Sequence, residues 1–417
     1  GLVENVQILS SNLVQNPSFS EEGVQEVSNG SFSQEGSELI IGGDFSNPSD
    51  WSLSGQNLSI SNGKGISTGS NFGAQFKQTI LTINKTYKLV FDIVDYTSGA
   101  IGLTANYYGV QQTFNSVGTH TAYFTSLNQT ELRLYSENFI GSIDNCSVRE
   151  VGQDWTLGTG WSIGEDKATF DGVSNANLTQ SNILTNGKQY KLTYEILENT
   201  TTSGYIRLGA ETATAISQLN TSIGTHTMYF TNDGYTSSLV IRTNSLTGGV
   251  FSITNISVKE VGMDWVLNTG WEIGNNVVKT DGTINSNIYQ NAVTTIGQTY
   301  TYSFDVLDSG VGVIDGRFRN GGGFIQNFSS EGTYTGTFVA YNTLADFTTL
   351  SGNTASFSIT NISIIEISTD TNLPRINYEG FSYQDALGSE EIVNGDFATD
   401  SDWLFGGSAS ISNGSAN

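Results

Sequence analysis

The sequence predicts an all-β protein made of tandem antiparallel β-sandwich (jelly-roll) modules. Three observations predict this fold class: a block of sequence recurs with a period of about 110 residues, its interior segments place an apolar residue at every second position, and helical periodicity is absent. The chain has 417 residues and one cysteine. We therefore expect several modules that each bury a core without disulfide bonds.

A tryptophan motif marks the start of each predicted module. The segment Asp154-Trp155-Thr-Leu-Gly-Thr-Gly-Trp161 recurs as Asp264-Trp265-Val-Leu-Asn-Thr-Gly-Trp271, and shorter copies begin at Asp50 and Asp402. The predicted modules span 39–151, 152–261 and 262–367, a linker or extended clip spans 368–388, and a fourth, incomplete module begins at 389 and continues to 417. The repeat thus predicts three complete bodies and the start of another.

Each predicted module contains a central strand and a closing strand. The central strand has an apolar face at Tyr87, Leu89, Phe91 and Ile93, and its copies have the same alternation at 190–196 and 300–306. The closing strand changes its apolar phase at Asn145, Asn255 and Asn361. A β-bulge at each of these asparagines would explain the change of phase.

A shorter repeat occupies the N-terminal residues 1–38. Phenylalanines recur every 13 residues, at Phe19, Phe32 and Phe45, each at the end of a short Asn/Gly-containing turn. The pattern predicts copies of a first strand that pair with a sheet edge of this chain or of a neighbouring chain. Removal of 1–38 is expected to abolish assembly without unfolding the modules.

The net negative charge of the chain disfavours anionic partners. The chain carries 16 Lys and Arg against 40 Asp and Glu, a net charge of −24, which repels nucleic acids and anionic lipid surfaces. No apolar stretch is long enough for a membrane span, so we expect no membrane insertion. Neutral glycans, cations and protein surfaces remain as partners, and an extracellular or virion location is expected.

The repeated motifs resemble those of a known class of modules. The opening Asn394-Gly-Asp-Phe followed by Asp402-Trp403, the alternating central strand and the closing Ile-Asp-Asn or Ile-Thr-Asn strand resemble the jelly-roll carbohydrate-binding modules appended to xylanases and laminarinases. They also resemble tandem modules in tail and fibre proteins of marine and flavobacterial phages, in which a segment similar to Asn372-Leu-Pro-Arg-Ile376 recurs between modules. The resemblance covers nearly all of 39–367.

Sugar-binding modules need an exposed flat ring beside polar groups. The candidates are aromatic residues that follow the central strands or repeat in the opening motif: Trp161, Trp271, Tyr107, Tyr108, Tyr205 and Phe324, with Phe114 and Phe318 nearby. For the tryptophans, a core position beside a turn is the favoured alternative to a binding platform. Module one has Asn57 where modules two and three have a second tryptophan.

The resemblance also implies a structural calcium ion near the first and last strands. Asp44 and Asp144 occupy the matching positions in module one, whereas modules two and three carry Thr254 and Thr360 in place of Asp144. The alternative interpretation is that both aspartates are turn and cap residues.

The histidines and the cysteine are interpreted as packing residues. His120 and His226 are equivalent, and module three has Tyr334 at the same position. Cys146 corresponds to Ile256 and Ile362, which indicates a small buried apolar side chain. No repeated pair of carboxylates indicates glycoside hydrolysis, so we expect no enzyme.

These observations favour a non-catalytic structural or adhesive protein of a virion appendage or extracellular fibre. Its modules would contact glycans or a host surface through many weak sites, and it would associate with itself or with other fibre proteins. The alternative is a secreted or cell-surface bacterial polysaccharide-binding protein, in the form of the non-catalytic part of a glycoside hydrolase. The sequence does not identify the glycan, the host, the symmetry of assembly or the partner that completes the fourth module.

Overall fold

The structure is a computed structural model of the chain. It describes residues 6–69, 73–105, 111–171, 175–209, 217–232, 237–283, 286–310, 312–350, 355–370, 395–399 and 403–416. Throughout these residues the elements are antiparallel β-strands and one short 3₁₀ helix, so the predicted all-β sandwich class is confirmed. Among the described residues, no helix is long and apolar enough to cross a bilayer.

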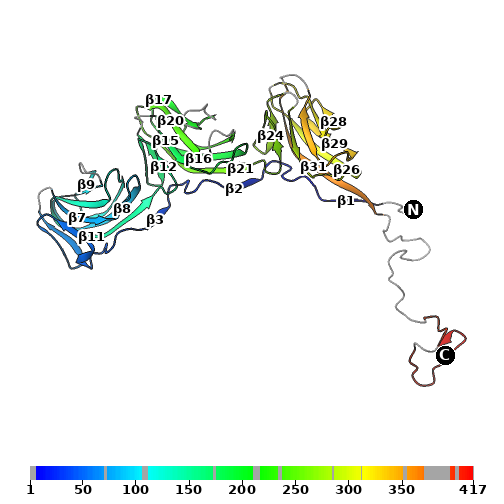
Figure 1. The fold of residues 1–417 in the computed structure, drawn as a ribbon, viewed down its shortest axis with the longest axis horizontal. Helices are drawn as coiled ribbons and strands as arrows, with labels where there is room; N and C mark the ends of the chain where they lie inside the picture. The colour runs from blue at the N-terminus through cyan, green and yellow to red at the C-terminus, as the bar shows by residue number, and fades with distance from the viewer. Residues whose placement is uncertain are drawn as a thin grey trace.

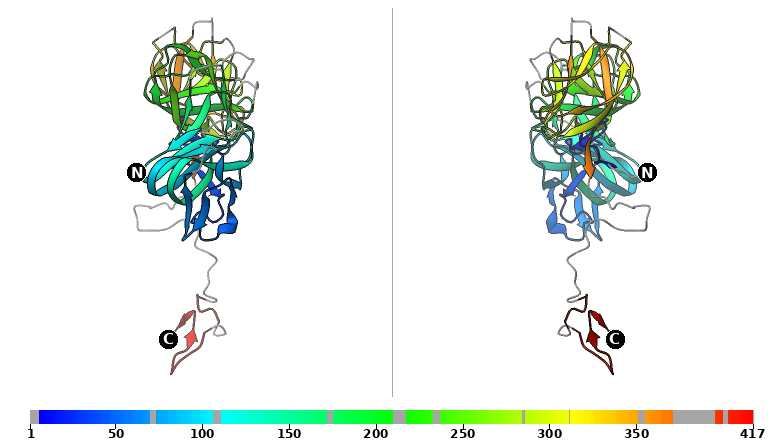
Figure 2. Two further views of the ribbon diagram at one scale, coloured as in Figure 1. Left: turned by 90° about the vertical axis from the view of Figure 1, so that its left-hand side faces the viewer. Right: turned by 90° about the vertical axis from the view of Figure 1, so that its right-hand side faces the viewer.

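Three β-sandwiches lie in a row, and Figure 1 shows the N-terminal segment running along one side of all three. Figure 2 looks along the row from either end, so the sandwiches overlap in projection. Each sandwich has one sheet that receives a strand from the N-terminal segment, which we call the strap sheet, and a second sheet that packs against it. We call residues 6–45 the strap.

Module two shows the arrangement most simply. Its strap sheet has the order β13-β14-β21-β16-β19, and its second sheet has the order β12-β15-β20-β17-β18. The strand bounds are β12 Thr156–Leu157, β13 Trp161–Gly164, β14 Lys167–Phe170, β15 Asn177–Gln180, β16 Gln189–Asn199, β17 Ser203–Leu208, β18 Ser217–Gln218, β19 Gly224–Thr231, β20 Leu239–Thr247 and β21 Phe251–Val261.

Module three repeats this topology. Its strap sheet is β23-β24-β31-β26-β29 and its second sheet is β22-β25-β30-β27-β28. The bounds are β22 Val266–Leu267, β23 Trp271–Gly274, β24 Val277–Thr280, β25 Asn287–Gln290, β26 Thr299–Asp308, β27 Gly316–Asn320, β28 Gly323–Phe328, β29 Gly332–Val339, β30 Ala345–Thr349 and β31 Phe357–Asp370. The last strand therefore extends three residues into the stretch predicted as a linker.

In module one, two long strands pass through both layers and join them into one nine-stranded sheet. These are β8 (Thr86–Thr104) and β11 (Glu131–Val151). The other elements are the 3₁₀ helix η1 Pro48–Asp50 and the strands β4 Ser52–Ser54, β5 Leu58–Ser61, β6 Lys64–Thr68, β7 Ala74–Thr79, β9 Gln112–Phe114 and β10 Gly118–Thr125.

The apolar faces of the central strands form the three cores. Phe91, Tyr194 and Phe304 are each at most 2% exposed, and each lies in a separate cluster of buried apolar side chains. The predicted bulges are confirmed, because the pairing register shifts around Asn145, Asn255 and Asn361.

The strap gives one edge strand to each module, in reverse order. Strand β1 (Val6–Leu9) pairs with β31 of module three, β2 (Glu22–Gln25) with β21 of module two, and β3 (Glu35–Glu38) with β11 of module one. The sequence predicted that the 13-residue repeat pairs with a sheet edge of this chain or of a neighbouring chain. In the structure it pairs with sheet edges of this chain.

Each strap repeat ends in the same anchored turn. Phe19, Phe32 and Phe45 are at most 2% exposed. Their rings lie 5.2, 5.2 and 4.8 Å from the first tryptophans of modules three, two and one, which are Trp265, Trp155 and Trp51. The Nε1 of each tryptophan donates to a backbone carbonyl of the turn, and in module two this is Trp155 to Asn29 at 3.1 Å. The opening tryptophan is therefore the receptor for the strap.

A glutamine in each second sheet also grips the strap backbone. In module two, Gln180 accepts from the amide of Ser28 at 2.7 Å and donates to its carbonyl at 2.8 Å. Gln290 does the same with Gln15 of the strap, and Gln78 does so with Ile41. The side-chain amide thus replaces a strand neighbour for one strap residue in each module.

The C-terminal segment repeats part of this design. Its described elements are β32 (Ile411–Ser412) and β33 (Ser415–Ala416), which form a hairpin. Phe397 and Trp403 lie 4.8 Å apart between ring centroids, the separation found for Phe45 and Trp51. The segment thus begins as module one does, with its turn and its tryptophan in one continuous stretch.

Candidate functional site

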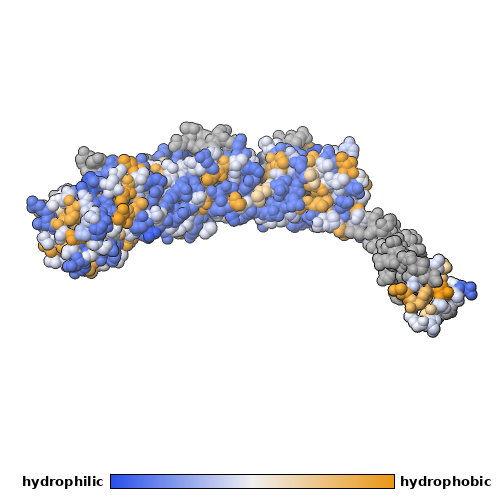
Figure 3. All heavy atoms as spheres, turned by 60° about the horizontal axis from the view of Figure 1, so that its bottom comes forward, coloured by the Kyte–Doolittle hydropathy of each residue, from blue (hydrophilic) through white to orange (hydrophobic). Residues whose placement is uncertain are grey.

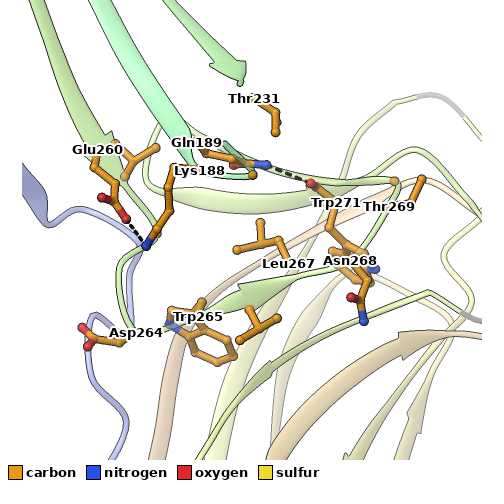
Figure 4. Close-up of a pocket in the computed structure, with 15 residues that line it drawn as sticks. Lys188, Gln189, Thr231, Glu260, Asp264, Trp265, Leu267, Asn268, Thr269 and Trp271 are labelled. Atoms are coloured by element: carbon orange, nitrogen blue, oxygen red, sulfur yellow. Dashed lines mark hydrogen bonds and ion pairs between the residues drawn. The ribbon is translucent and has the colours of Figure 1, made fainter. Parts of the chain in front are cut away.

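A cavity of about 570 Å³ lies at the junction of modules two and three (Figure 4). Lys188 and Glu260 form an ion pair of 2.7 Å on one side of it. Gln189 donates to the carbonyl of Trp271 at 3.0 Å and accepts from the amide of Ile273 at 2.7 Å. These polar groups are satisfied by each other, so the cavity belongs to a structural junction.

A tyrosine packs on a glycine at both junctions. The ring of Tyr123 lies over Gly164, and the ring of Tyr229 lies over Gly274, so closely that a Cβ at either glycine would stand within 3.1 Å of the ring. Module three carries Thr337 at the tyrosine position of its own β29. Among the described residues, the sequence thus encodes this contact at the junction of modules one and two and at that of modules two and three.

The second tryptophans of the opening motif are core residues. Trp161 is 6% exposed and packs on Phe170, with ring centroids 5.4 Å apart, whereas Trp271 is 4% exposed and packs on Phe357 at 5.8 Å. Neither presents a ring face to solvent, so the binding-platform interpretation fails for both and the core alternative describes them. The side chain plugs the end of the sandwich where the β13 or β23 hairpin closes.

The outer face of the second sheet of module two gathers a ring, amides and guanidinium groups. Tyr205 and Arg207 alternate along β17 with buried Ile206 and Leu208, so both side chains point away from the core. Arg207 lies directly opposite Arg242 of β20, and Tyr205 lies opposite Asn244. Tyr205, predicted from the sequence, is thus half-buried on a polar face.

A cavity of about 570 Å³ opens beside Arg242 on this face. The described residues that line it are partly polar and partly apolar and include no carboxylate: Thr156, Leu157, Gly158, Thr159, Asn175, Ala176, Asn177, Thr179 and Arg242. Nη1 of Arg242 donates to Oδ1 of Asn177 at 3.3 Å. Hydroxyl, amide and guanidinium groups suit a polyhydroxylated ligand.

The equivalent face of module three carries the most exposed candidate ring. Phe324 is 63% exposed, and the guanidinium carbon of Arg317 lies 5.4 Å from its ring centroid. Nε of Arg317 also donates to Asn327 at 2.8 Å, which fixes the guanidinium beside the ring. Phe318, by contrast, is 1% exposed and belongs to the core.

In module one the candidate tyrosines lie outside the described residues. Tyr107 and Tyr108 fall between 106 and 110, which the structure does not describe. Phe114 is half-buried and packs edge-on against Phe91, with ring centroids 5.1 Å apart. Phe114 therefore extends the core.

Each histidine forms a hydrogen bond to the backbone of the loop that precedes its strand. Nε2 of His120 donates to the carbonyl of Ser116 at 2.7 Å, and Nε2 of His226 donates to that of Ser222 at 2.6 Å. Tyr334 does the same in module three, with its hydroxyl 3.0 Å from the carbonyl of Ser330. Cys146 is 5% exposed, and burial raises the pKa of its thiol, as a packing residue requires.

Asp44 and Asp144 act as caps of their own turns. Asp44 accepts from the amide and the hydroxyl of Ser46 at 3.1 and 2.8 Å, and these hydrogen bonds lower the pKa of its carboxyl. Asp144 accepts from the amide of Asn145 at 2.7 Å. Within the described ranges, no three His, Cys, Asp or Glu side chains gather closely enough to share a metal ion. Calcium therefore stays a prediction based on the resemblance.

Two sets of functional residues were missed from the sequence. The glutamine clamps follow a core residue by two positions in every module, as in Leu178-Thr-Gln180, so the repeat itself held the signal. The sequence held no comparable indication that Arg207 and Arg242 are neighbours. The two residues are 35 positions apart, and the strand register brings them together.

No protein-family model and no curated protein matches the chain. Among solved structures, the chain is similar to the tandem CBM22-1-CBM22-2 domain of Xyn10C from Paenibacillus barcinonensis (11% identity, 52% of this chain, 94% of that chain, TM-score 0.22). It is also similar to a chain of Sulfolobus Turreted Icosahedral Virus (13%, 76%, 90%, TM-score 0.20) and to the tandem CBM51 modules of a family 98 glycoside hydrolase from Streptococcus pneumoniae (9%, 48%, 83%, TM-score 0.19). Likeness at these TM-scores does not establish a shared fold or function. The description of the chain as a row of three β-sandwiches joined by the strap rests on its own contacts.

Proposed function

We propose that this chain is a non-catalytic structural and adhesive rod of a virion appendage or extracellular fibre, which contacts glycans through the outer faces of its second sheets. The observation that carries the proposal is the strap. One continuous segment completes three sandwiches in turn, so the modules are tied into a row by their own cores (Figure 1).

The strap connects the modules more firmly than a simple linker would. Each repeat buries an aliphatic side chain and a phenylalanine, and burial of one such side chain contributes about 1.5–3 kcal/mol. These side chains are Val14, Phe19, Val27, Phe32, Ile40 and Phe45. Because neighbouring anchors are joined by a short extended segment, bending at a junction would require an anchor to leave its core. A row held in this way suits a spacer that sets distances between sites.

The surface suits multivalent contact. Tyr205 and Phe324 lie on equivalent sheets of successive modules, each beside an arginine. On the face drawn in Figure 3, hydrophobic residues form small separate patches among hydrophilic ones. Several weak ring-and-amide sites in a fixed row gain avidity on a repetitive glycan without any strong single pocket.

Imaging and glycan binding together test the proposal. Electron microscopy of the native assembly is expected to show the chain at regular intervals along a fibre or appendage. An array of glycans probed with the full chain is expected to show weak binding that increases when the chain is presented on a multivalent bead. Tyr205→Ala and Phe324→Ala should each reduce bead binding several-fold.

The control is Ile223→Ala, which removes a 70% exposed apolar side chain elsewhere in module two and should leave bead binding unchanged. A soluble, unassembled chain that binds one polysaccharide tightly would favour the bacterial polysaccharide-binding alternative. Turnover of any glycan by the purified chain would overturn the non-catalytic assignment.

A further inference from the structure

Cations lie directly opposite each other across strands at four places in the described residues. The pairs are Lys88 with Arg149, Lys191 with Lys259, Lys77 with Arg133, and Arg207 with Arg242. Like charges at opposed positions destabilise a sheet, so each pair calls for a compensating anion.

A glutamate lies between the two cations in three of these pairs. Glu35 lies 2.6 Å from Lys88 and 3.8 Å from Arg149. In the same way, Glu22 contacts Lys191 and Lys259 at 2.6 and 2.9 Å, and Glu131 contacts Lys77 and Arg133 at 3.8 and 2.6 Å. The chain thus follows one rule, a carboxylate between paired cations.

The fourth pair breaks the rule. Within the described part of the chain, no carboxylate forms an ion pair with Arg207 or Arg242, and the Nε atoms of both are buried without a hydrogen-bond partner. Among the residues that the structure describes, the guanidinium groups make one hydrogen bond to the protein, from Nη1 of Arg242 to Oδ1 of Asn177 at 3.3 Å. Two adjacent guanidinium groups are therefore not neutralised by any acid of the described residues.

We propose that Arg207 and Arg242 bind an oxyanion carried on a sugar ring, either the carboxylate of a uronic acid or a sulfate ester. This inference rests on the proposed glycan contact and names its chemical class at module two. The guanidinium fork matches both anions. Tyr205 on the same strand face offers a ring for the pyranose, and the carboxylate-free cavity beside Arg242 offers hydroxyls and amides for its other groups.

The charge of the whole chain sharpens the choice of ligand. A net charge of −24 repels densely charged polymers at long range, whereas two local cations attract an isolated anionic group. The site is thus suited to a glycan in which acidic sugars are interspersed with neutral ones.

Calorimetric titration of the full chain tests this site with three sets of oligosaccharides of equal length. These are galactose oligomers that contain one galacturonic acid residue, galactose oligomers that carry one 6-sulfate, and unmodified neutral galactose oligomers. At least one of the acidic sets should bind the wild-type chain at least tenfold more tightly than the neutral set, and the better set identifies carboxylate or sulfate as the ligand. The double variant Arg207→Gln/Arg242→Gln should lose that preference.

The double variant Lys77→Gln/Arg133→Gln is the matched control, because it removes the same charge from an opposed pair of cations that Glu131 already neutralises. It should keep the acidic preference. Thermal unfolding of the Arg207→Gln/Arg242→Gln variant should stay at or above the wild-type temperature, which shows that a loss of binding is not a loss of fold. Equal binding of acidic and neutral sets, or an unchanged preference in the Arg207→Gln/Arg242→Gln variant, would overturn this inference alone. Absence of binding to any of the three sets would overturn it together with the glycan contact proposed above.

Discussion

The first repeat of the strap and the second differ in chemistry although their geometry is the same. Both end in a buried phenylalanine against a tryptophan, with a glutamine clamp on the backbone. Their edge strands differ, however. The second repeat places Glu22 between Lys191 and Lys259 of module two. The first repeat has Leu9 instead, and module three has Thr301 and Ile365 in place of the two lysines. The common anchors supply affinity, and the differing edges distinguish the first repeat from the second.

This division follows from the range of each interaction. Aromatic burial is strong but would accept any of the three repeats, because the turns and tryptophans match. A glutamate facing Thr301 and Ile365 would lose its ion pairs, and a leucine facing Lys191 and Lys259 would leave two cations without an anion. Charge thus separates the first repeat, which has Leu9, from the second and third, which have Glu22 and Glu35.

Removal of the first two repeats should have the largest effect. A chain that begins at residue 33 keeps the third repeat and module one but exposes the receptor tryptophans of modules two and three. We expect module one to unfold at its original temperature and modules two and three to lose several kcal/mol each. Differential scanning calorimetry should resolve the separate transitions.

This outcome would correct the expectation that the modules survive loss of residues 1–38. In the structure the first repeat is part of module three and the second is part of module two. If all transitions stayed at their wild-type temperatures, the strap would not stabilise the sandwiches, and this would contradict the proposal that it holds the modules in a rod.

Single anchors should have the next largest effect. Phe32→Ala should destabilise module two, and Phe19→Ala module three, by about 3–5 kcal/mol, the cost of emptying a packed aromatic site. Phe324→Ala, which truncates an exposed ring, should change the free energy of unfolding by less than about 0.5 kcal/mol. Chemical denaturation followed by tryptophan fluorescence measures these differences, because each buried anchor touches a tryptophan. Similar losses in all three variants would contradict the anchor assignment.

The sandwiches, the central strands and the bulges at Asn145, Asn255 and Asn361 were predictable because they depend on local alternation that recurs in each module. The route of the strap was not, because β1 pairs with residues more than 350 positions away and nothing local distinguishes that partner from a neighbouring chain. The site was predicted less well than the fold. Tyr205 and Phe324 stay predicted site residues, and the core position favoured for Trp161 and Trp271 is confirmed. The pairing of Arg207 with Arg242 was not predictable, because it depends on strand register.

Exchange of edge chemistry should have a smaller, salt-dependent effect. Glu22→Gln leaves Lys191 and Lys259 opposite each other without an anion and should destabilise module two by about 1 kcal/mol at low salt, since the groups are partly exposed. Leu9→Gln, the matched change in the first repeat, should show no salt dependence. In about 1 M salt the effect of Glu22→Gln should shrink. An effect that does not respond to salt would contradict charge as the feature that separates the first repeat from the second.

The same glutamate predicts a pH effect with a definite sign. Hydrogen bonds from Lys191 and Lys259 lower the pKa of Glu22 below its ordinary value of 4.5. A carboxyl with a lowered folded pKa stabilises the fold at pH above its unfolded pKa, and that contribution is lost as the pH falls through the folded pKa. Wild-type module two should therefore lose stability below about pH 4.5 more steeply than the Glu22→Gln variant. Parallel curves for the two proteins would contradict the ion-pair role.

A small change in stability is expected at the junction tyrosines. Tyr229 covers Gly274 and packs partly buried against the core of the next module, so Tyr229→Ala should change the free energy of unfolding by about 1 kcal/mol while loosening the angle between modules two and three. Small-angle X-ray scattering should record this as a broader distribution of maximum dimensions. Thr337→Ala, at the equivalent position where no such junction exists, should leave the scattering unchanged. If Tyr229→Ala scattered like the wild type, the strap alone would hold the angle, because each module would still carry its anchored repeat.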